Sequence, residues 1–446
     1  MTGEGEFRPH GSLESARLPP PDVIGSVNKP VQPRRGVAYS PHGRMRHNSR
    51  ILTALFPMLR LLRQAYWRQW QHVQGTMQLD EGPAERTAQK AAGQDAPAGA
   101  TTPCAAPVAR QPCRYGIILA LLWSLLGVVF LGSLLLGHYP LAPDTVVAIL
   151  VSQVLDIPRS WPERAETVVL AVRVPRAAAA VLVGAALSVA GSTYQSLFCN
   201  PLVSPAVLGV AAGAGCGAAL AMTMHLSALA VQVAAFSGGL LAVGLSVWVA
   251  QRLGKGSPIV LILAGMAISA LFQALIAVFK YIADPIDVLP VITFWLMGGL
   301  GRVTGADVLH ATGPVLMALA LVWALRWQVN VLTLGDDEAR ALGVRTARIR
   351  ALLIVAATLM TAAAVSISGI VAWVGLLVPH MARLLVGPSF PTLLPVTLVM
   401  GGGYLLLVDD VCRSVARTDV PLGILTALLG APVFIILLTR GRHGWF

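Results

Sequence analysis

Charged side chains are scarce in this chain. Asp, Glu, Lys and Arg together make up 12% of its 446 residues, whereas hydrophobic residues make up 55%. Soluble globular domains carry about 25% charged residues, so the composition excludes an ordinary soluble protein. Apolar runs long enough to cross a bilayer core of about 30 Å recur from Gly116 onward. We therefore expect an all-α, polytopic membrane protein with about ten transmembrane helices, at 116–137, 176–197, 205–223, 227–250, 258–280, 308–326, 349–367, 370–386, 392–410 and 422–439.

The chain also lacks the sequence patterns of a nucleotide site or a metal site. No G-x-x-x-x-G-K followed by Ser or Thr occurs, so we expect no P-loop ATP site in this chain. The five cysteines do not stand at metal-ligand spacing. His380 follows Pro379 without a second His or Cys at ligand spacing, which favours a structural hydrogen bond over a metal ligand. With no recognisable catalytic residues, we expect a protein that is not itself an enzyme and holds no cofactor or metal.

Ionisable groups are nearly absent from the middle of the apolar runs. Ion- or proton-coupled carriers usually place carboxylates or histidines there. An ion-coupled secondary transporter is therefore a remote alternative, and a membrane scaffold or receptor without transport is a third. If the chain transports a solute, we expect the energy to come from another protein.

The net charge of +12 is unevenly distributed. Residues 1–115 hold 15 basic and 8 acidic side chains, which by the positive-inside rule places the N-terminus in the cytoplasm. We expect 1–114 to be a mostly disordered cytoplasmic extension. Residues 51–70 have helical apolar spacing, which indicates either a basic amphipathic helix on the inner leaflet or a loose helix without a membrane role. No nucleic-acid-binding fold is recognisable in this segment. We therefore expect it to contact membrane lipid and no nucleic acid.

A polar island, Thr333–Arg345, lies between two apolar runs. It predicts a short charged helix, Asp336–Leu342, which ends at Gly343. Asp336 and Asp337 lie in its first turn, where negative charges interact favourably with the helix dipole. Alternation of the expected spans places this helix, like both chain termini, in the cytoplasm. There it would be a handle through which a soluble protein moves the membrane part.

Four arginines fall on the outer face in this topology, against the positive-inside rule: Arg173, Arg176, Arg413 and Arg417. One interpretation is a basic rim that docks an acidic soluble partner. The other is that they reach lipid phosphates or pair with nearby aspartates, namely Asp409, Asp410 and Asp419.

Several blocks of sequence then follow one another in a recognisable order. The first runs from RVPRAAAAVLVGAALSVAG at 173–191 to YQSLFCNPLVSPAVLG at 194–209. LGDDEARALGV follows at 334–344, then SGIVAWVGLLVPHMARLLVG at 368–387 and DDVCR at 409–413. These blocks resemble those of FecCD-type permeases, the membrane subunits of ABC importers for iron–siderophore, haem and cobalamin. The resemblance covers about 115–446.

The resemblance implies a cobalamin-permease-like fold for 115–446 and a multi-pass permease subunit of a binding-protein-dependent importer in the inner membrane. ATP hydrolysis in a separate ABC ATPase subunit would drive it. The expected cargo is an iron(III)–siderophore-type chelate, with haem or cobalamin as alternatives. A second copy of the chain, or a homologous permease, would complete the path.

The resemblance also assigns roles to residues. It implies that the ATPase subunit is contacted by Gly335, Asp336, Asp337, Glu338, Ala339, Arg340, Leu342, Gly343 and Val344. A periplasmic or lipid-anchored substrate-binding protein would dock on Arg173, Arg176 and Arg413. The translocation path and its structural motifs would include Gln195, Asn200, Pro201, Gly209, Gly213, Pro379 and His380.

Overall fold

The computed structural model describes residues 112–137, 139–156, 158–254, 258–415 and 419–440. The chain divides into two units, 1–107 and 108–446. The first unit lies outside the described residues, as do nearly all of the expected extension 1–114 and the expected amphipathic helix 51–70.

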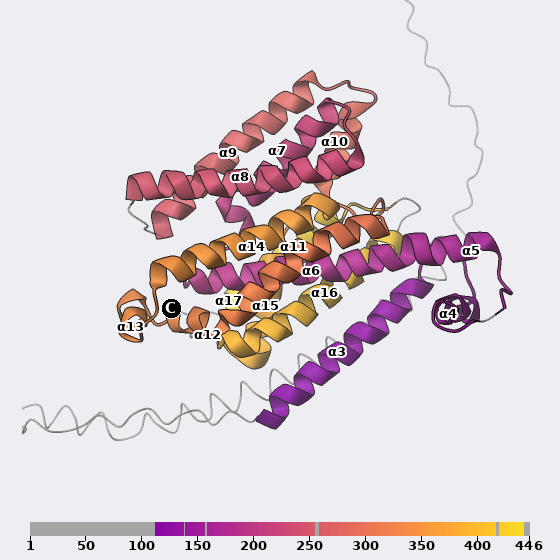
Figure 1. The fold of residues 1–446 in the computed structure, drawn as a ribbon, viewed down its shortest axis with the longest axis horizontal. Coiled ribbons are helices and arrows are strands. Elements are labelled where there is room, and N and C mark those ends of the chain that lie inside the picture. The colour runs from indigo at the N-terminus through magenta and orange to yellow at the C-terminus, as the bar shows by residue number, and fades with distance from the viewer. Residues whose placement is uncertain (1–111, 138, 157, 255–257, 416–418, 441–446) are drawn as a thin grey trace, which may run out of the picture. The chain divides into compact units, whose positions relative to one another are not determined.

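The described residues are helical, without strands (Figure 1). In chain order the elements are α3 (Pro112–Leu135), α4 (Pro143–Val151), α5 (Glu163–Thr167), the π-helix η1 (Val168–Arg173), α6 (Val174–Leu197), the 3-10 helix η2 (Pro205–Leu208), α7 (Val210–Thr223), α8 (Ala228–Gly254), α9 (Pro258–Ile282), α10 (Val288–Met297), α11 (Gly305–Ala324), α12 (Arg326–Leu332), α13 (Asp336–Ala341), α14 (Thr346–Ser368), α15 (Val374–Val386), α16 (Phe390–Val415) and α17 (Leu422–Arg440).

Each expected span coincides with a helix, which confirms the expected all-α membrane fold. Among the described residues, seven helical stretches are long and apolar enough to cross a membrane, and shorter apolar helices accompany them. α7, α15 and α17, each predicted as a span, belong to the shorter group. The prediction did not include α10, a ten-residue helix between α9 and α11. Its brevity explains this, because a run of that length is far below the roughly 20 residues that indicate a membrane helix.

Glycine contacts bring α6 close to α15 and α16. A Cβ atom at Gly184 would overlap the carbonyl oxygen of Gly401 on α16, and one at Gly191 would overlap that of Gly375 on α15. Such close backbone approach is how membrane helices gain van der Waals contact without a hydrophobic driving force. α14 completes this group: 72% of its most apolar window is buried, against 22% for α9.

A second group consists of α7, α8, α9 and α10, which lie together along one side of the bundle (Figure 1). They share apolar clusters of their own, for example Cys216 of α7 with Ala242 of α8 and Phe272 of α9. Gly213 of α7 faces the Gly238 carbonyl of α8 so closely that any Cβ atom would overlap it. The small residue is therefore required by this helix pair.

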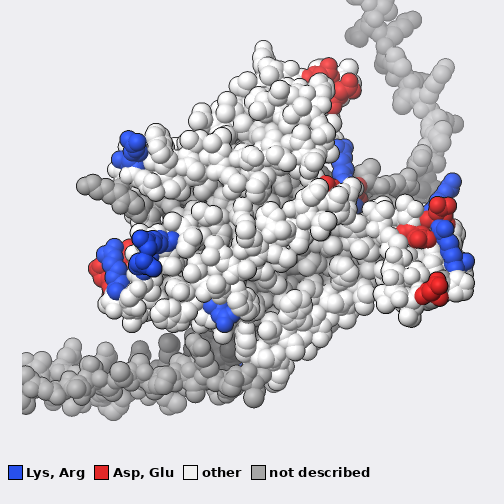
Figure 2. Space-filling model, in the orientation of Figure 1, with Lys and Arg blue, Asp and Glu red and all other residues white. Residues whose placement is uncertain are grey.

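On the face that Figure 2 shows, charged side chains lie toward the two ends of the helices, and the surface between them is uncharged. One end, which we call the arginine end, carries Arg173, Arg176 and Arg413. The opposite end, which we call the α13 end, carries α12 and α13 (Figure 1). An uncharged middle zone is what a bilayer core requires of a membrane protein.

Candidate functional site

The arginine end is held together by a buried ion-pair network. Arg176, near the start of α6, donates from Nε and Nη2 to the Asp409 carboxylate at 2.9 Å each. Its Nη1 donates to Asp419 at 2.7 Å. The Asp409 side chain is fully buried, whereas that of Asp419 is 40% exposed. One guanidinium thus neutralises two aspartates that lie more than 230 positions away in sequence.

Arg413 and Arg173 fix the end of α3 to the same network. Arg413 donates to the backbone oxygen of Ser133 at 3.0 Å and pairs with Asp410. Arg173, the last residue of the π-helix η1, donates to the carbonyls of Leu134 at 2.8 Å and Tyr139 at 2.5 Å. Both arginines are buried, at 5% and 3% exposure. A π-turn widens the helix locally and is often found at functional positions; here it places Arg173 against α3.

The two interpretations of these arginines can now be compared with their geometry. Arg176 and Arg413 make the ion pairs with aspartates that one interpretation expected, and Arg173 binds backbone carbonyls. None of these three presents an open basic rim, because their guanidinium groups are occupied and largely buried. Arg417 lies outside the described residues. Their role in docking stays a prediction. Their burial and their contacts indicate that they also have a structural role.

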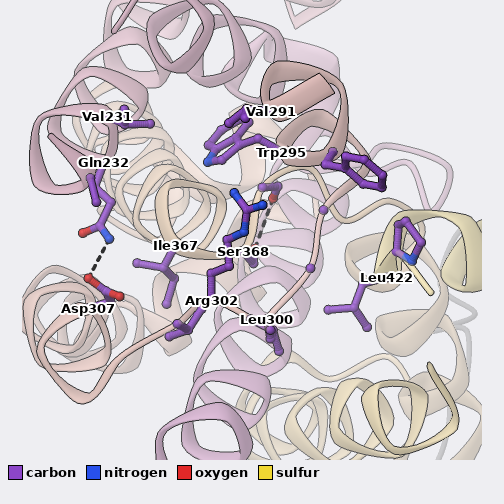
Figure 3. A pocket seen from close by; sticks show the side chains of 18 of the residues that line it. Val231, Gln232, Val291, Trp295, Leu300, Arg302, Asp307, Ile367, Ser368 and Leu422 are labelled. Carbon is purple, nitrogen blue, oxygen red and sulfur yellow. Dashed lines mark hydrogen bonds between the residues drawn. The ribbon is translucent and has the colours of Figure 1, made fainter. Parts of the chain in front are cut away.

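A cavity of about 630 Å³ opens beside this network (Figure 3). It lies between the two helix groups: α8 and α10 line one side, and α11, α14 and the start of α17 line the other. Aromatic and aliphatic walls come from Trp295, Phe294 and Val231, among others. Arg302, from the segment between α10 and α11, extends among the lining side chains (Figure 3). Of the predicted site residues only Arg176 lines this cavity, together with Asp409 and Asp419, which the sequence had indicated only as candidate partners of the arginines.

At the opposite end, α13 spans Asp336–Ala341, one residue shorter than predicted. Gly335 at φ 120° and Gly343 at φ 80° bound it, in conformations that favour glycine. Ala339 and Val344 are buried and attach the helix to the protein. The remaining predicted contact residues lie mostly on its outer side, where Asp337, Glu338, Arg340, Leu342 and Gly343 are exposed.

An ion pair connects α13 to α14. Arg350 donates from Nη2 to the Asp336 carboxylate at 2.6 Å. Beside it, the Cys199 thiol contacts the Leu332 carbonyl of α12 at 3.9 Å. Burial raises the pKa of the Cys199 thiol, and the neighbouring Arg350 opposes that shift. A push on α13 would therefore reach both α14 and the turn after α6.

Gln195 forms the polar contact at the α13 end of α6. Its Nε2 donates to the Leu376 carbonyl of α15 at 3.3 Å, and its Oε1 accepts from Arg383. Both side chains are buried, and Arg383 makes no ion pair with a carboxylate among the described residues. The backbone oxygen of Gln195 accepts from Asn200 at 3.0 Å. Gln195 thus joins α6, α15 and the following turn.

The other predicted path residues mainly determine the backbone conformation at their own positions. The Asn200 side chain accepts from the backbone N–H of Leu202 at 2.9 Å, and Pro201 follows in the same turn. Gly209 ends η2 at φ 91° in the left-handed region. Pro379 lies within α15, followed by the half-buried His380. Gln195 contacts α15 on both sides of Pro379 and His380, at Leu376 and Arg383. The role of these residues in a path stays a prediction.

Comparison with known proteins decides the family. Residues 125–440 match the FecCD transport family. The chain belongs to the FecCD transport family. The molybdate import system permease protein MolB of Haemophilus influenzae is 36% identical over 334 residues, which are 75% of this chain and 98% of MolB.

Two further comparisons agree with this membership. A Helicobacter pylori protein named a probable iron chelatin transport system permease protein is 38% identical over 275 residues, covering 62% of this chain and 83% of that protein. A solved structure described as a metal-chelate type ABC transporter in an inward-facing conformation is 36% identical. It superposes with a TM-score of 0.66 and covers 73% of this chain and 100% of that one.

Two features of this FecCD chain were not predicted from its sequence. Arg383 was visible in the block at 368–387, but nothing local signals that its partner is an amide of α6. The cavity is assembled from segments between Arg176 and Leu422, so no single stretch of sequence carries its pattern. The available signal for Arg383 was a cation within an apolar run, which is costly in a membrane and marks a specific interaction.

Proposed function

We propose that this FecCD chain is the permease subunit of a binding-protein-dependent ABC importer that carries an iron(III)–siderophore-type chelate across the inner membrane. Haem or cobalamin carried by the same machinery is the alternative. The relatives named for molybdate and iron chelatin support import as the shared task while differing in cargo. In this proposal the arginine end faces the outside, and both chain termini and the α13 end face the cytoplasm.

The surface of α13 is the observation that carries the proposal. It presents exposed charges of both signs, with Asp337 at 93% and Arg340 at 63% side-chain exposure. Exposed charges that are complementary to a partner fix the orientation of docking more than its affinity. Because Asp336 pairs with Arg350 on α14, a separate ATPase subunit seated on α13 would act directly on the helix group of α6, α14, α15 and α16.

Two further partners belong to the proposal. α9 exposes large apolar side chains along its length, for example Met266 at 58%, Leu271 at 54% and Val278 at 51%. A second copy of the chain or a homologous permease, together with lipid, would cover them. At the outer surface, Arg173, Arg176 and Arg413 would support the docking of a substrate-binding protein by holding α3, α6 and α16 in register.

Uptake by reconstituted liposomes tests the proposal. The chain, its ATPase and its binding protein should together import ⁵⁵Fe-labelled chelate only when ATP is hydrolysed. The double reversal Glu338→Lys/Arg340→Glu should abolish uptake while leaving membrane insertion unchanged. Arg252→Glu is the matched control, because it reverses an exposed charge near the end of α8, outside α13. Uptake that persists with a catalytically inactive ATPase and follows a proton gradient would contradict the importer assignment.

A further inference from the structure

The junction of α11 and α12 presents an aromatic and cationic surface at the α13 end. Trp323 and Trp327 are 43% and 55% exposed. The Cζ atom of Arg326, the first residue of α12, lies 4.8 Å from the centroid of the Trp323 ring, within cation–π distance. This contact orients the guanidinium without neutralising its charge, so the charge remains available to an anion.

The start of α3 lies beside this junction. Arg326 is close enough to Tyr115 of α3 for its charge to act on the phenol. Arg114, the neighbour of Tyr115 in the first turns of α3, is exposed. We call these five residues, Arg114, Tyr115, Trp323, Arg326 and Trp327, the α3–α12 patch. It joins two elements that are far apart in sequence.

The positive charges of the α3–α12 patch have no counter-ion among the described residues. Neither Arg114 nor Arg326 makes an ion pair there. The sequence around them explains this, because no Asp or Glu occurs in 112–143 or in 308–335. By contrast, α13 carries its own acidic residues. An anion from outside the described chain is therefore the matching partner of the patch.

Exposed apolar side chains continue from the patch toward the middle of the bundle. On α3 they are Ile117, Leu121 and Val128, at 59%, 64% and 68% exposure, with the helical spacing that places them on one side. On α11 they are Leu316 and Met317, at 54% and 64% exposure. A matching partner thus has an anionic head and apolar chains.

The weak packing of α3 favours a lipid as that partner. Among the candidate membrane spans of the described residues, α3 is the least buried, with 17% of its most apolar window buried. Arg173 and Arg413 attach its far end to the rest of the protein. A soluble anion would leave the tryptophan rings and the apolar side chains uncovered. A lipid that contacts both α3 and α12 would cover them and attach the near end of α3.

We propose that the α3–α12 patch binds an anionic diacyl phospholipid. The headgroup phosphate lies between Arg114 and Arg326, Trp323 and Trp327 lie at the level of the glycerol backbone, and the acyl chains follow α3 and α11. The cytoplasmic leaflet as its location rests on the orientation proposed above, whereas the class of lipid does not. Because α12 leads directly into α13, the lipid would hold the base of α13 at the membrane surface.

Native mass spectrometry of the full-length chain in detergent tests the class of lipid. Palmitoyl-oleoyl phosphatidylglycerol should bind at least about fivefold more tightly than palmitoyl-oleoyl phosphatidylcholine, which has the same chains and a zwitterionic head. sn-Glycerol 3-phosphate, which has no acyl chain, should not displace it. Equal affinity for the two lipids would overturn the proposal. Displacement by glycerol phosphate would identify a soluble-anion site and overturn it too.

Cross-linking with a photoactivatable phosphatidylglycerol, followed by peptide mapping, tests the location. Peptides from the start of α3 and from the α11–α12 junction should carry the cross-links. Arg326→Gln and Arg114→Gln should each reduce them about fivefold, and Trp323→Leu about two- to fivefold. Arg326→Lys, which keeps the charge, should retain most of the signal. A loss with Arg326→Gln that Arg326→Lys does not rescue would contradict an electrostatic role.

Arg252→Gln on α8 is the matched control. The Cζ atom of Arg252 lies 5.5 Å from the Trp248 ring, so the same chemistry occurs in the other helix group. The end of α8 also lies on the α13 side of the molecule (Figure 1). Arg252→Gln should leave the cross-links to α3 and the α11–α12 junction unchanged. An equal loss in this control, or no loss with Arg326→Gln and Arg114→Gln, would overturn the location.

The assembled transporter separates a lipid from a protein partner. The cross-links should persist when the ATPase subunit is bound, because the proposed lipid lies beside α12 and the ATPase contacts α13. If the ATPase abolishes them, the patch belongs to its interface and the lipid assignment is overturned. ATP-driven uptake without selectivity for the anionic lipid would contradict only the lipid site. Persistent cross-links without ATP-driven uptake would contradict only the importer function.

Discussion

Replacing Arg176 with methionine should destabilise the protein more than replacing its partner Asp409 with asparagine. The Asp409 side chain is fully buried, and its other nearby cation is Arg413, whose Nε lies at 3.8 Å. The Arg176→Met variant would therefore leave a buried carboxylate with one distant partner. The Asp409→Asn variant leaves Arg176 bonded to Asp419 at 2.7 Å, on a carboxylate that water also reaches.

The magnitudes follow from these environments. Removing one partner of a buried ion pair costs about 3–5 kcal/mol, because the other charge stays buried without compensation. We expect Arg176→Met to fall in that range, and Asp409→Asn to cost about 1–3 kcal/mol, the penalty for weakened buried hydrogen bonds. The double variant Arg176→Met/Asp409→Leu should recover most of the loss, because an apolar pair of similar volume often replaces a buried ion pair at little cost.

Thermal unfolding in detergent, read out by loss of monodisperse protein, provides the assay. Arg176→Met should lower Tm by about 5–15 °C, and the double variant should lie closer to the unaltered protein. Arg164→Met removes an exposed arginine of α5 and is the control. Affinity for the binding protein is measured in parallel. An unchanged Tm with weakened docking would refute the structural reasoning and favour the basic-rim interpretation.

Other predictions concern α6 and its neighbours. Gly191→Leu should prevent a monodisperse fold on size-exclusion chromatography, because its side chain would overlap the Gly375 carbonyl; Gly244→Leu should not. Arg383→Met should lower Tm by leaving the buried Gln195 carbonyl oxygen without its donor, at about 1–3 kcal/mol; an unchanged Tm would contradict this. Partial burial raises the pKa of the exposed Cys199 thiol, and its labelling by a membrane-impermeant maleimide should accelerate as pH rises. The Cys199 adduct, identified by peptide mapping because Cys104 and Cys113 can also react, should be absent from Cys199→Ser and require access from the α13 side.

The helices and α13 could be predicted because their signals are local. Apolar runs of membrane-spanning length define the helices, and Gly335, Gly343 and a cluster of acidic residues define α13 within one short segment. Patterns of this kind depend only on neighbouring residues, so the surrounding fold does not have to be known.

The breaks between helices depended on contacts far away in sequence. Gly369, at φ 67°, lies against the Trp295 carbonyl, and α15 begins only at Val374 after a non-helical segment. Trp373 itself has φ 69°, which is uncommon for a bulky residue and requires support from its surroundings. The prediction therefore extended the span back to 370, because periodicity alone shows an uninterrupted apolar run.

The arginine network could be anticipated only as one of two alternatives. Arg176 and Asp409 are 233 positions apart, and a single sequence holds no signal that joins them. The cavity has the same limitation, because its walls come from both helix groups. In the sequence, these side chains could be identified by their charge. Their partners could be identified only from the folded structure.

The contacts of α6 restrict how this permease can change shape. Arg176 near one end and Gln195 near the other connect α6 to α16 and α15, and glycine contacts lock its middle. A helix fixed at both ends and at its middle moves with its neighbours as one body. Motion between this body and the group of α7 to α10 would have to loosen contacts such as that of Gly239 on α8 with Ala362 on α14. The cavity lies at that boundary, so rigid-body rocking that starts at α13 would reshape the cavity without any titrating group.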